Sequence, residues 1–183
     1  MKYRERVQCL INLREVQIAL ITGILSLILN RFYPQIQVWR LTPPSLPRQF
    51  FLTLEPATIV GVIAACIVGP WAGLIIAIFA PNPQFIPEVG IIISTVQFIT
   101  IGYAHRKIQS PWNILAIPLG TVVISIIHPT IVGYILFKQV FVYLFFGTNM
   151  LFQTIVSLVA YLLVRFFVPQ FFEWTRAREG HIH

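Results

Sequence analysis

The stretch from Phe51 to Ala80 constrains the fold of this chain more than any other part of the sequence. After Glu55 it carries no charged side chain, and the turn Gly69-Pro70 divides it into two apolar halves. In water such a segment would expose a large apolar surface. The pattern therefore predicts two helices in lipid, joined by a tight turn at Gly69-Pro70.

The second of these two helices is predicted to be short. It covers about residues 71–80 and ends at Pro81-Asn82-Pro83. An apolar helix of about 11 residues rises roughly 16 Å, which is about half the thickness of the hydrocarbon layer. Because the helix stops at a polar, proline-rich break inside a membrane protein, we look for a ligand site near this break.

The composition is typical of a membrane protein with a single domain. Of the 183 residues, 57% are hydrophobic and 10% are charged, whereas an average soluble protein carries about 25% charged residues. The formal net charge of +7 comes from basic residues at the ends of the apolar stretches. This distribution indicates membrane topology and argues against nucleic acid as a partner.

The sequence offers little support for catalysis. Asp is absent, and the glutamates are scattered along the chain, whereas phosphoryl transfer and most metal-dependent reactions use clustered carboxylates. The sequence contains no phosphate-binding glycine loop, no zinc-binding spacing and no Gly-x-Ser-x-Gly motif. We therefore expect that the protein is not an enzyme and binds no cofactor and no metal.

The hydropathy pattern predicts an all-α fold, a six-helix transmembrane bundle with a short or broken third helix and a long structured loop after helix one. The single transmembrane domain covers residues 16–168, with spans at about 16–29, 52–68, 71–80, 89–103, 112–137 and 150–168. A basic segment (1–15) precedes it and a basic tail (169–183) follows it. Because basic residues favour the cytoplasmic side, we expect a multi-pass protein of the cell membrane with both termini in the cytoplasm.

Two parts of this topology stay open. If the third helix is only re-entrant, the chain has five spans and its termini lie on opposite sides. Residues 112–146 form either one helix to Phe137, bent at His128-Pro129 and followed by an external segment up to Asn149, or two short helices. Periodicity does not decide between these alternatives.

The connection from Asn30 to Phe50 is long for a small membrane protein. It contains four prolines, Trp39 and the arginines Arg31, Arg40 and Arg48. A long structured connection is often a lid over a binding site. By alternation this one lies outside the cell, where its arginines run against the positive-inside tendency and hint at an anionic ligand or lipid headgroups.

Polar side chains at membrane depth or near the presumed outer mouth are the candidate ligand contacts. Glu88 also fits a helix cap, while Gln97, His128 and Gln153 also fit hydrogen bonds between helices. The predicted substrate-binding residues are Trp39, Asn82, Gln84, Glu88, Gln97, His128, Lys138 and Asn149.

Ala19 and Gly23 form a small-residue face on the first span. Two small residues at this spacing let another helix approach closely. The approaching helix belongs either to this chain or to a partner subunit, and the sequence leaves both alternatives open.

Together these features resemble the substrate-binding S component of energy-coupling factor (ECF) transporters. Ala19-x-x-x-Gly23 is similar to the family's Ala-x-x-x-Ala motif, although Gly23 replaces the second alanine. The long loop after the first span and the apolar, glycine-rich hairpin from Glu55 to Gly73, turning at Gly69-Pro70, are also similar to the family.

The resemblance implies high-affinity binding and uptake of a vitamin or similar micronutrient. The site would open outward and be built by the outer loops and spans four to six. Ala19 and Gly23 would contact a transmembrane coupling subunit, which is attached to two cytoplasmic ATPases. The long loop would close over the ligand.

Two other functions remain as alternatives. A non-transporting membrane scaffold of the MreD cell-shape type has similar length, spans and hairpin, but usually carries an Asp where this chain has Pro81-Asn82-Pro83. A small self-sufficient transporter is the other alternative, and the scarcity of paired charges inside the membrane counts against proton coupling.

Overall fold

The computed structural model describes residues 13–33, 36–41, 50–79, 87–128 and 141–170, and this part of the chain is mostly helical. Its elements are α2 (Leu13–Phe32), β1 (Ile36–Leu41), β2 (Phe50–Leu54), α3 (Pro56–Val68), α4 (Pro70–Phe79), α5 (Pro87–Lys107), the 3-10 helix η1 (Trp112–Leu115), α6 (Ala116–His128) and α7 (Phe141–Phe167).

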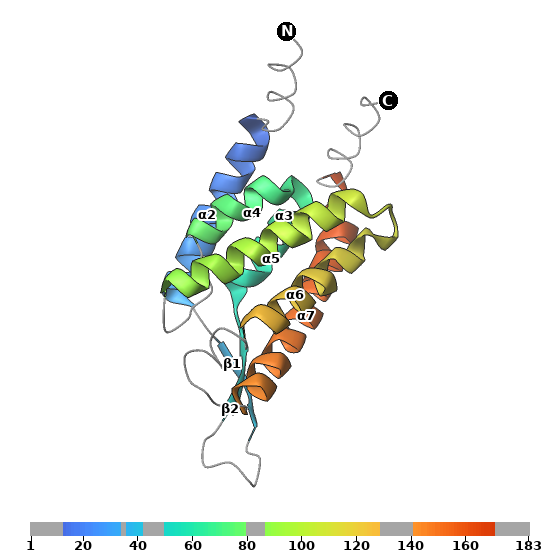
Figure 1. Ribbon diagram of the computed structural model, residues 1–183. Helices are drawn as coiled ribbons and strands as arrows, with labels where there is room; N and C mark the ends of the chain where they lie inside the picture. The colour runs from blue at the N-terminus through green and yellow to red at the C-terminus, as the bar shows by residue number, and fades with distance from the viewer. Residues whose placement is uncertain (1–12, 34–35, 42–49, 80–86, 129–140, 171–183) are drawn as a thin grey trace.

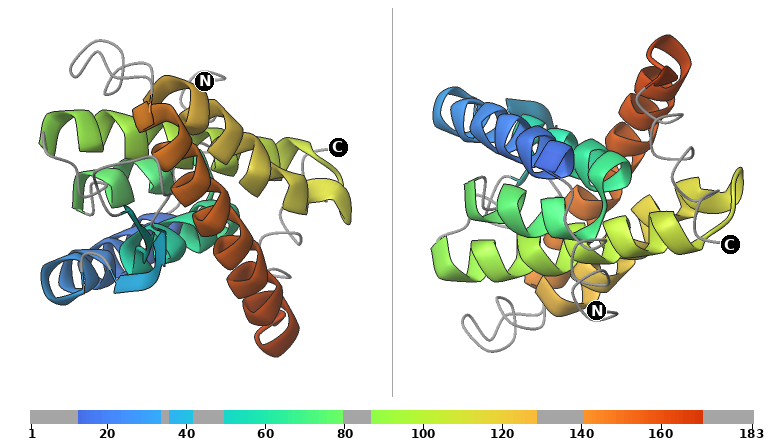
Figure 2. Two further views of the ribbon diagram at one scale, coloured as in Figure 1. Left: turned by 90° about the horizontal axis from the view of Figure 1, so that it is seen from below. Right: turned by 90° about the horizontal axis from the view of Figure 1, so that it is seen from above.

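The helices of the described part run alternately up and down (Figure 1). The start of α2 and the end of α7 lie at one end of the bundle, and the two strands lie at the opposite end. Figure 2 shows α4 between α2 and α5, with α6 on the other side of α5. α3 packs against α2, α4, α5 and α7, so it is the central helix.

The predicted turn at Gly69-Pro70 joins α3 to α4 in the structure. Gly69 adopts φ 89° and ψ −169°, a conformation that is essentially restricted to glycine. Its N–H donates to the carbonyl oxygen of Ala65 at 2.9 Å and closes the last turn of α3. α4 has 10 residues, so the third helix is short as the sequence predicts.

Glycines bring α5 into close contact with this hairpin. A Cβ at Gly102 would stand 2.6 Å from the backbone of Gly69 and Pro70, and a Cβ at Gly61 would overlap the ring of Phe98. Phe98 itself is almost completely buried. The small residues of α3 therefore set how near α5 can approach, as is common for helices that pack tightly.

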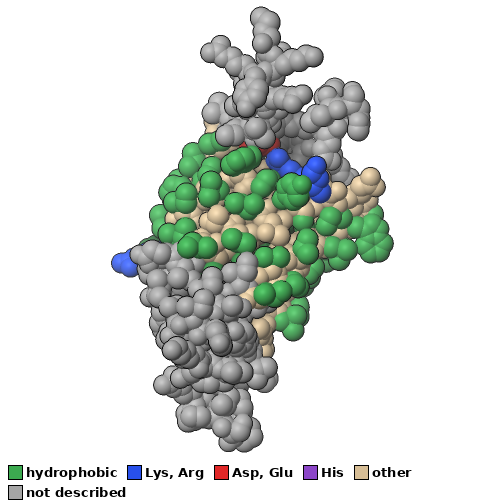
Figure 3. Space-filling view, viewed as in Figure 1, with side chains coloured by type: hydrophobic (Ala, Val, Ile, Leu, Met, Phe, Trp, Pro, Cys, Tyr) green, Lys and Arg blue, Asp and Glu red, His purple; other side chains and the backbone are tan. Residues whose placement is uncertain are grey.

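Many large apolar side chains of the described part lie on the surface of the bundle, while its core is also mainly apolar. α2, α5, α6 and α7 expose many large apolar side chains, among them Ile21, Ile92, Val122 and Leu163. Figure 3 shows apolar side chains over the middle of the visible face. The buried polar and charged residues of the described part are Ser26, Thr53, Glu55, Thr58, Ser94, Gln97, His105, Thr121, Gln153, Thr154 and Ser157.

Two described helices are long and apolar enough to cross a membrane. They are α2, over Glu15–Phe32, and α7, over Gly147–Phe167. α2 extends the predicted first span at both ends, and α5 likewise extends the predicted fourth span of 89–103.

The described part is mostly helical, as predicted, but β1 and β2 form an antiparallel hairpin in the long loop after α2, so the expectation of a helix from residue 52 is wrong. The helix starts only at Pro56. A residue before proline is disfavoured in the α conformation, and Glu55 is extended, with φ −112° and ψ 92°. The chain before it continues as the strand β2.

The helix boundaries near the C-terminal half also differ from the prediction. The 3-10 helix η1 precedes α6, which the structure describes as far as His128. Residues 129–137 of the predicted fifth span lie outside the described part. α7 begins at Phe141 rather than Met150, so Asn149 lies inside a helix and not in an external loop. Because residues 129–140 lie outside the described part, the structure does not test whether 112–137 form one bent helix.

Candidate functional site

A buried group of polar side chains lies where β2 and α3 meet α7. We call it the Thr53 cluster, and its members are Thr53, Glu55 and Thr58 from the β2–α3 junction and Asn149 and Gln153 from α7. Four of these side chains are buried, and Asn149 is half-buried. The cluster lies at the hairpin end of the bundle.

Two amide side chains of α7 bond both backbone groups of Thr53. The N–H of Thr53 donates to Oδ1 of Asn149 at 3.0 Å, and Nε2 of Gln153 donates to the carbonyl oxygen of Thr53 at 2.6 Å. Asn149 and Gln153 are four residues apart, so they lie on one face of α7. These two bonds attach the hairpin to the helix bundle.

The contacts of Thr53 also fix which way the Gln153 amide points. A carbonyl oxygen can only accept, so the amide nitrogen of Gln153 must face it and Oε1 must point elsewhere. Oε1 is buried, and among the described residues it has no hydrogen-bond partner. Such an atom in a native structure calls for an explanation, because burying an unpaired acceptor is costly.

Glu55 occupies the N-cap position of α3 and is only 7% exposed. Its carboxylate accepts a hydrogen bond from Oγ1 of Thr58 at 3.0 Å. The positive end of the helix dipole stabilises a carboxylate at this position. A buried carboxylate in an apolar bundle is expensive and is therefore a candidate for function.

The sequence prediction named Asn149 and Gln97 among the ligand contacts. Asn149 is part of the Thr53 cluster, and Gln97 is buried on α5. Trp39 lies in β1, Glu88 in the first turn of α5 and His128 at the end of α6. The strands, the start of α5 and the end of α6 lie toward the same end of the bundle (Figure 1).

The remaining predictions for the ligand site are not tested by the geometry. The side chains of Trp39, Glu88 and His128 lie outside the described part, and so do Asn82, Gln84 and Lys138 altogether. Of the predicted ligand contacts, Asn149 therefore belongs to the Thr53 cluster. For the others, the structure describes no contact with this cluster.

Sequence reasoning did not name Thr53, Glu55 or Thr58 as ligand contacts. It considered Gln153 for a hydrogen bond between helices, whereas Gln153 bonds the backbone of a strand. Two features of the sequence could have pointed to these residues. The spacing of Asn149 and Gln153 places two amides on one helix face, and Pro56 marks a helix start directly after Glu55.

The small-residue face of α2 is used inside the chain. Ala19 is completely buried, and a Cβ at Gly23 would stand 3.0 Å from the ring of Phe79 on α4. Of the two alternatives that the sequence left open, the structure therefore has the internal one. Neither residue is presented on the exposed surface of α2.

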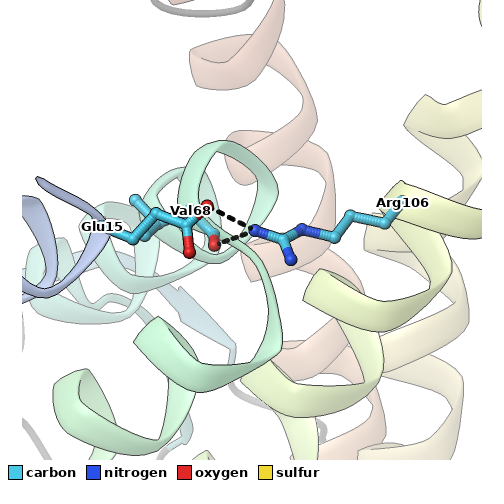
Figure 4. A network of polar contacts seen from close by, with 3 residues as sticks. All are labelled: Glu15, Val68 and Arg106. Atoms are coloured by element: carbon cyan, nitrogen blue, oxygen red, sulfur yellow. Dashed lines mark hydrogen bonds and ion pairs between the residues drawn. The ribbon is translucent and has the colours of Figure 1, made fainter. Parts of the chain in front are cut away.

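A second group of polar contacts lies at the opposite end of the bundle (Figure 4). Nη2 of Arg106 donates to the carbonyl oxygen of Val68 at 2.5 Å and to the carboxylate of Glu15 at 3.2 Å. One side chain of α5 thus ties together the start of α2 and the end of α3.

A buried histidine network lies at the same end. Arg165 donates to Oδ1 of Asn113 at 3.4 Å, so Nδ2 of Asn113 faces Nε2 of His105 at 3.2 Å. Tyr161 contacts the same nitrogen through its hydroxyl group at 2.8 Å. Nε2 of His105 thus lies within hydrogen-bond distance of side chains from both η1 and α7.

The described residues contain no group of three or more His, Cys, Asp or Glu side chains that could hold a metal ion. Comparisons of this chain with models of protein families, with curated proteins and with solved structures find no match. We therefore infer the function from the Thr53 cluster and from the arrangement of the helices.

Proposed function

We propose that this protein is the substrate-binding membrane subunit of an ECF-type transporter and captures a vitamin or similar micronutrient. The six helices cross the membrane of the cell, and the β1–β2 hairpin lies on the outer side. The ligand binds at the hairpin end of the bundle, next to the Thr53 cluster.

The distribution of side chains supports the membrane location. Lipid can cover the exposed apolar side chains of α2, α5, α6 and α7, which water would not tolerate in such number. Arg106 and Lys107 lie in the last turn of α5 and Arg165 lies in the last turn of α7, at the end of the bundle opposite the hairpin (Figure 1). By the positive-inside tendency this end faces the cytoplasm, together with both ends of the described chain.

The single observation that carries the ligand site is the Thr53 cluster. It places two buried groups where the hairpin joins the bundle: the Glu55 carboxylate, and the Oε1 atom of Gln153, which has no hydrogen-bond partner among the described residues. The hairpin acts as a lid: it closes over the ligand, excludes water and so strengthens the few polar contacts. Asn149 and Gln153 hold the lid through the backbone of Thr53.

Transport requires partners, because the chain carries no nucleotide-binding motif. We propose a transmembrane coupling subunit and two cytoplasmic ATPases. Since Ala19 and Gly23 are buried, contact with the coupling subunit involves the outward face of α2, where Ile21, Ile24 and Ile28 are exposed. Copurification of the chain with such a subunit tests this assignment.

The ligand site is tested by binding of vitamins to the purified chain in lipid nanodiscs. For a verified ligand, Trp39→Ala and His128→Ala are expected to weaken affinity, since both residues lie in elements at the hairpin end. Affinity that is unchanged in both variants would show that the site is placed wrongly. Copurification with cell-shape proteins and no small-molecule binding would instead favour a scaffold of the MreD type.

A further inference from the structure

The Thr53 cluster also indicates the chemistry of the ligand, an inference that rests on the proposed function. We infer that the ligand presents a hydrogen-bond donor to Oε1 of Gln153, within the cluster that holds the Glu55 carboxylate. A protonated amine fits this position best.

Three hydrogen bonds within the cluster each pair one donor with one acceptor. The Thr53 N–H donates to Asn149, the Thr58 hydroxyl donates to Glu55, and the Gln153 amide nitrogen donates to the Thr53 carbonyl oxygen. Within the described part, Oε1 of Gln153 is a buried acceptor of the cluster that has no hydrogen-bond partner. An acceptor is satisfied only by an N–H or O–H group.

Gln153 meets this requirement in a defined orientation. Its side chain is only 5% exposed, and the bond from Nε2 to Thr53 prevents the amide from turning Oε1 away. A ligand group that donates to Oε1 therefore removes an existing cost and does not have to displace a protein contact.

The position of Glu55 favours a positively charged donor. Its carboxylate is buried two residues after Thr53 and accepts from Thr58, and charges in such a place interact more strongly than in water. A cationic amine is attracted by this carboxylate, whereas a ligand carboxylate brought to the same place is repelled. Amine-bearing micronutrients are thus favoured over those that carry only carboxylates.

The first test compares probes on the full chain in lipid nanodiscs by titration calorimetry. Pyridoxamine carries a protonated amine, pyridoxal replaces that amine by an aldehyde, and biotin carries a carboxylate and uncharged ureido N–H groups but no amine. We expect an amine probe to bind and its partner without the amine to bind at least about tenfold more weakly. If biotin binds and no amine probe does, the inference is overturned while the proposed function stands.

If none of these probes binds, the molecule that the purified protein releases on denaturation decides. A released micronutrient with a donor amine supports the inference, and one without any amine overturns it. Release of no small molecule at all overturns the proposed function together with the inference.

The second test changes the acceptor. Gln153→Leu is expected to weaken binding of the amine ligand about tenfold or more, while the control Thr154→Val, a buried polar change at the next position of α7, leaves affinity within about threefold. Size-exclusion profiles and melting temperatures establish that each variant folds. Equal losses in the two variants would overturn the inference.

Gln153→Glu keeps an acceptor at this position but gives up the bond to the Thr53 carbonyl oxygen, since a carboxylate cannot donate. We expect it to bind the amine more tightly than Gln153→Leu does, because it keeps an acceptor. A loss as large as that of Gln153→Leu would mean that holding the hairpin, and not accepting from the ligand, is what Gln153 contributes.

Discussion

The guanidinium group of Arg106 lies directly over Gly69, at the place where a Cβ of that residue would stand. The same guanidinium bonds the carbonyl oxygen of Val68, one residue earlier (Figure 4). Two features therefore determine the turn between α3 and α4. They are the backbone conformation of Gly69 and the Arg106 side chain that packs over it.

Replacing Gly69 by alanine should destabilise the protein. Its φ of 89° and ψ of −169° are unfavourable for any residue with a Cβ, which costs about 1–3 kcal/mol, and the new methyl group would also displace Arg106. Thermal unfolding of the purified protein measures the effect. The matched control is Gly147→Ala, where a Cβ has no neighbour within 4 Å. Equal melting temperatures for the two variants would contradict this account of the turn.

Arg106 is expected to contribute more through Val68 than through Glu15. A hydrogen bond from a charged group to a backbone carbonyl contributes about 1.5–3 kcal/mol, whereas a partly exposed ion pair contributes about 0–1 kcal/mol. Arg106→Met should therefore lower the melting temperature clearly more than Glu15→Gln does. Lys107→Met, at the neighbouring exposed position, is the control and should have little effect. A cost for Glu15→Gln as large as that for Arg106→Met would refute the assignment.

The contact between Gly61 and Phe98 predicts a rescue. Gly61→Ala drives a methyl group into the buried Phe98 ring, and such overpacking costs about 1–3 kcal/mol. Combining it with Phe98→Leu, which makes room, should restore part of the stability lost in Gly61→Ala alone. The readout is the melting temperature of the two single variants and the double variant. Purely additive losses would show that the two residues do not limit each other.

The proposed topology predicts labelling from opposite sides of the membrane. In a Cys9→Ser background, Gln37→Cys in β1 should react with a membrane-impermeant maleimide from outside intact cells, because Gln37 is exposed on the hairpin. Gln109→Cys, after the end of α5, should react only in inverted vesicles. Cys66 is buried and can remain. Labelling of both cysteines from one side would contradict a bundle that spans the membrane.

The hairpin of α3 and α4 could be predicted because its signals are local. Pro56 and Gly69-Pro70 restrict the backbone whatever surrounds them. The strands were missed for the opposite reason. Residues Phe50–Leu54 form a short apolar run, and such a run does not distinguish a strand from a helix by its periodicity.

The Thr53 cluster could not be predicted from the sequence. The two residues in the bond between Thr53 and Asn149 are 96 positions apart in the chain. Their contact depends on where α7 packs. It also depends on the start of α7 at Phe141, which places Asn149 in a helix, whereas the sequence predicted a loop there. The packing partner of Ala19 and Gly23 could not be predicted for the same reason. Their spacing shows that one face of the helix carries small residues, but it does not show which helix packs against that face.

The most direct test of the central claim is mass spectrometry of the small molecules that the purified, lipid-embedded protein releases when it is denatured. The protein is expressed in a medium that supplies all vitamins. We predict a micronutrient in an amount close to that of the protein, and a strongly reduced amount from Gln153→Leu. Folded protein that releases no such molecule would contradict the account.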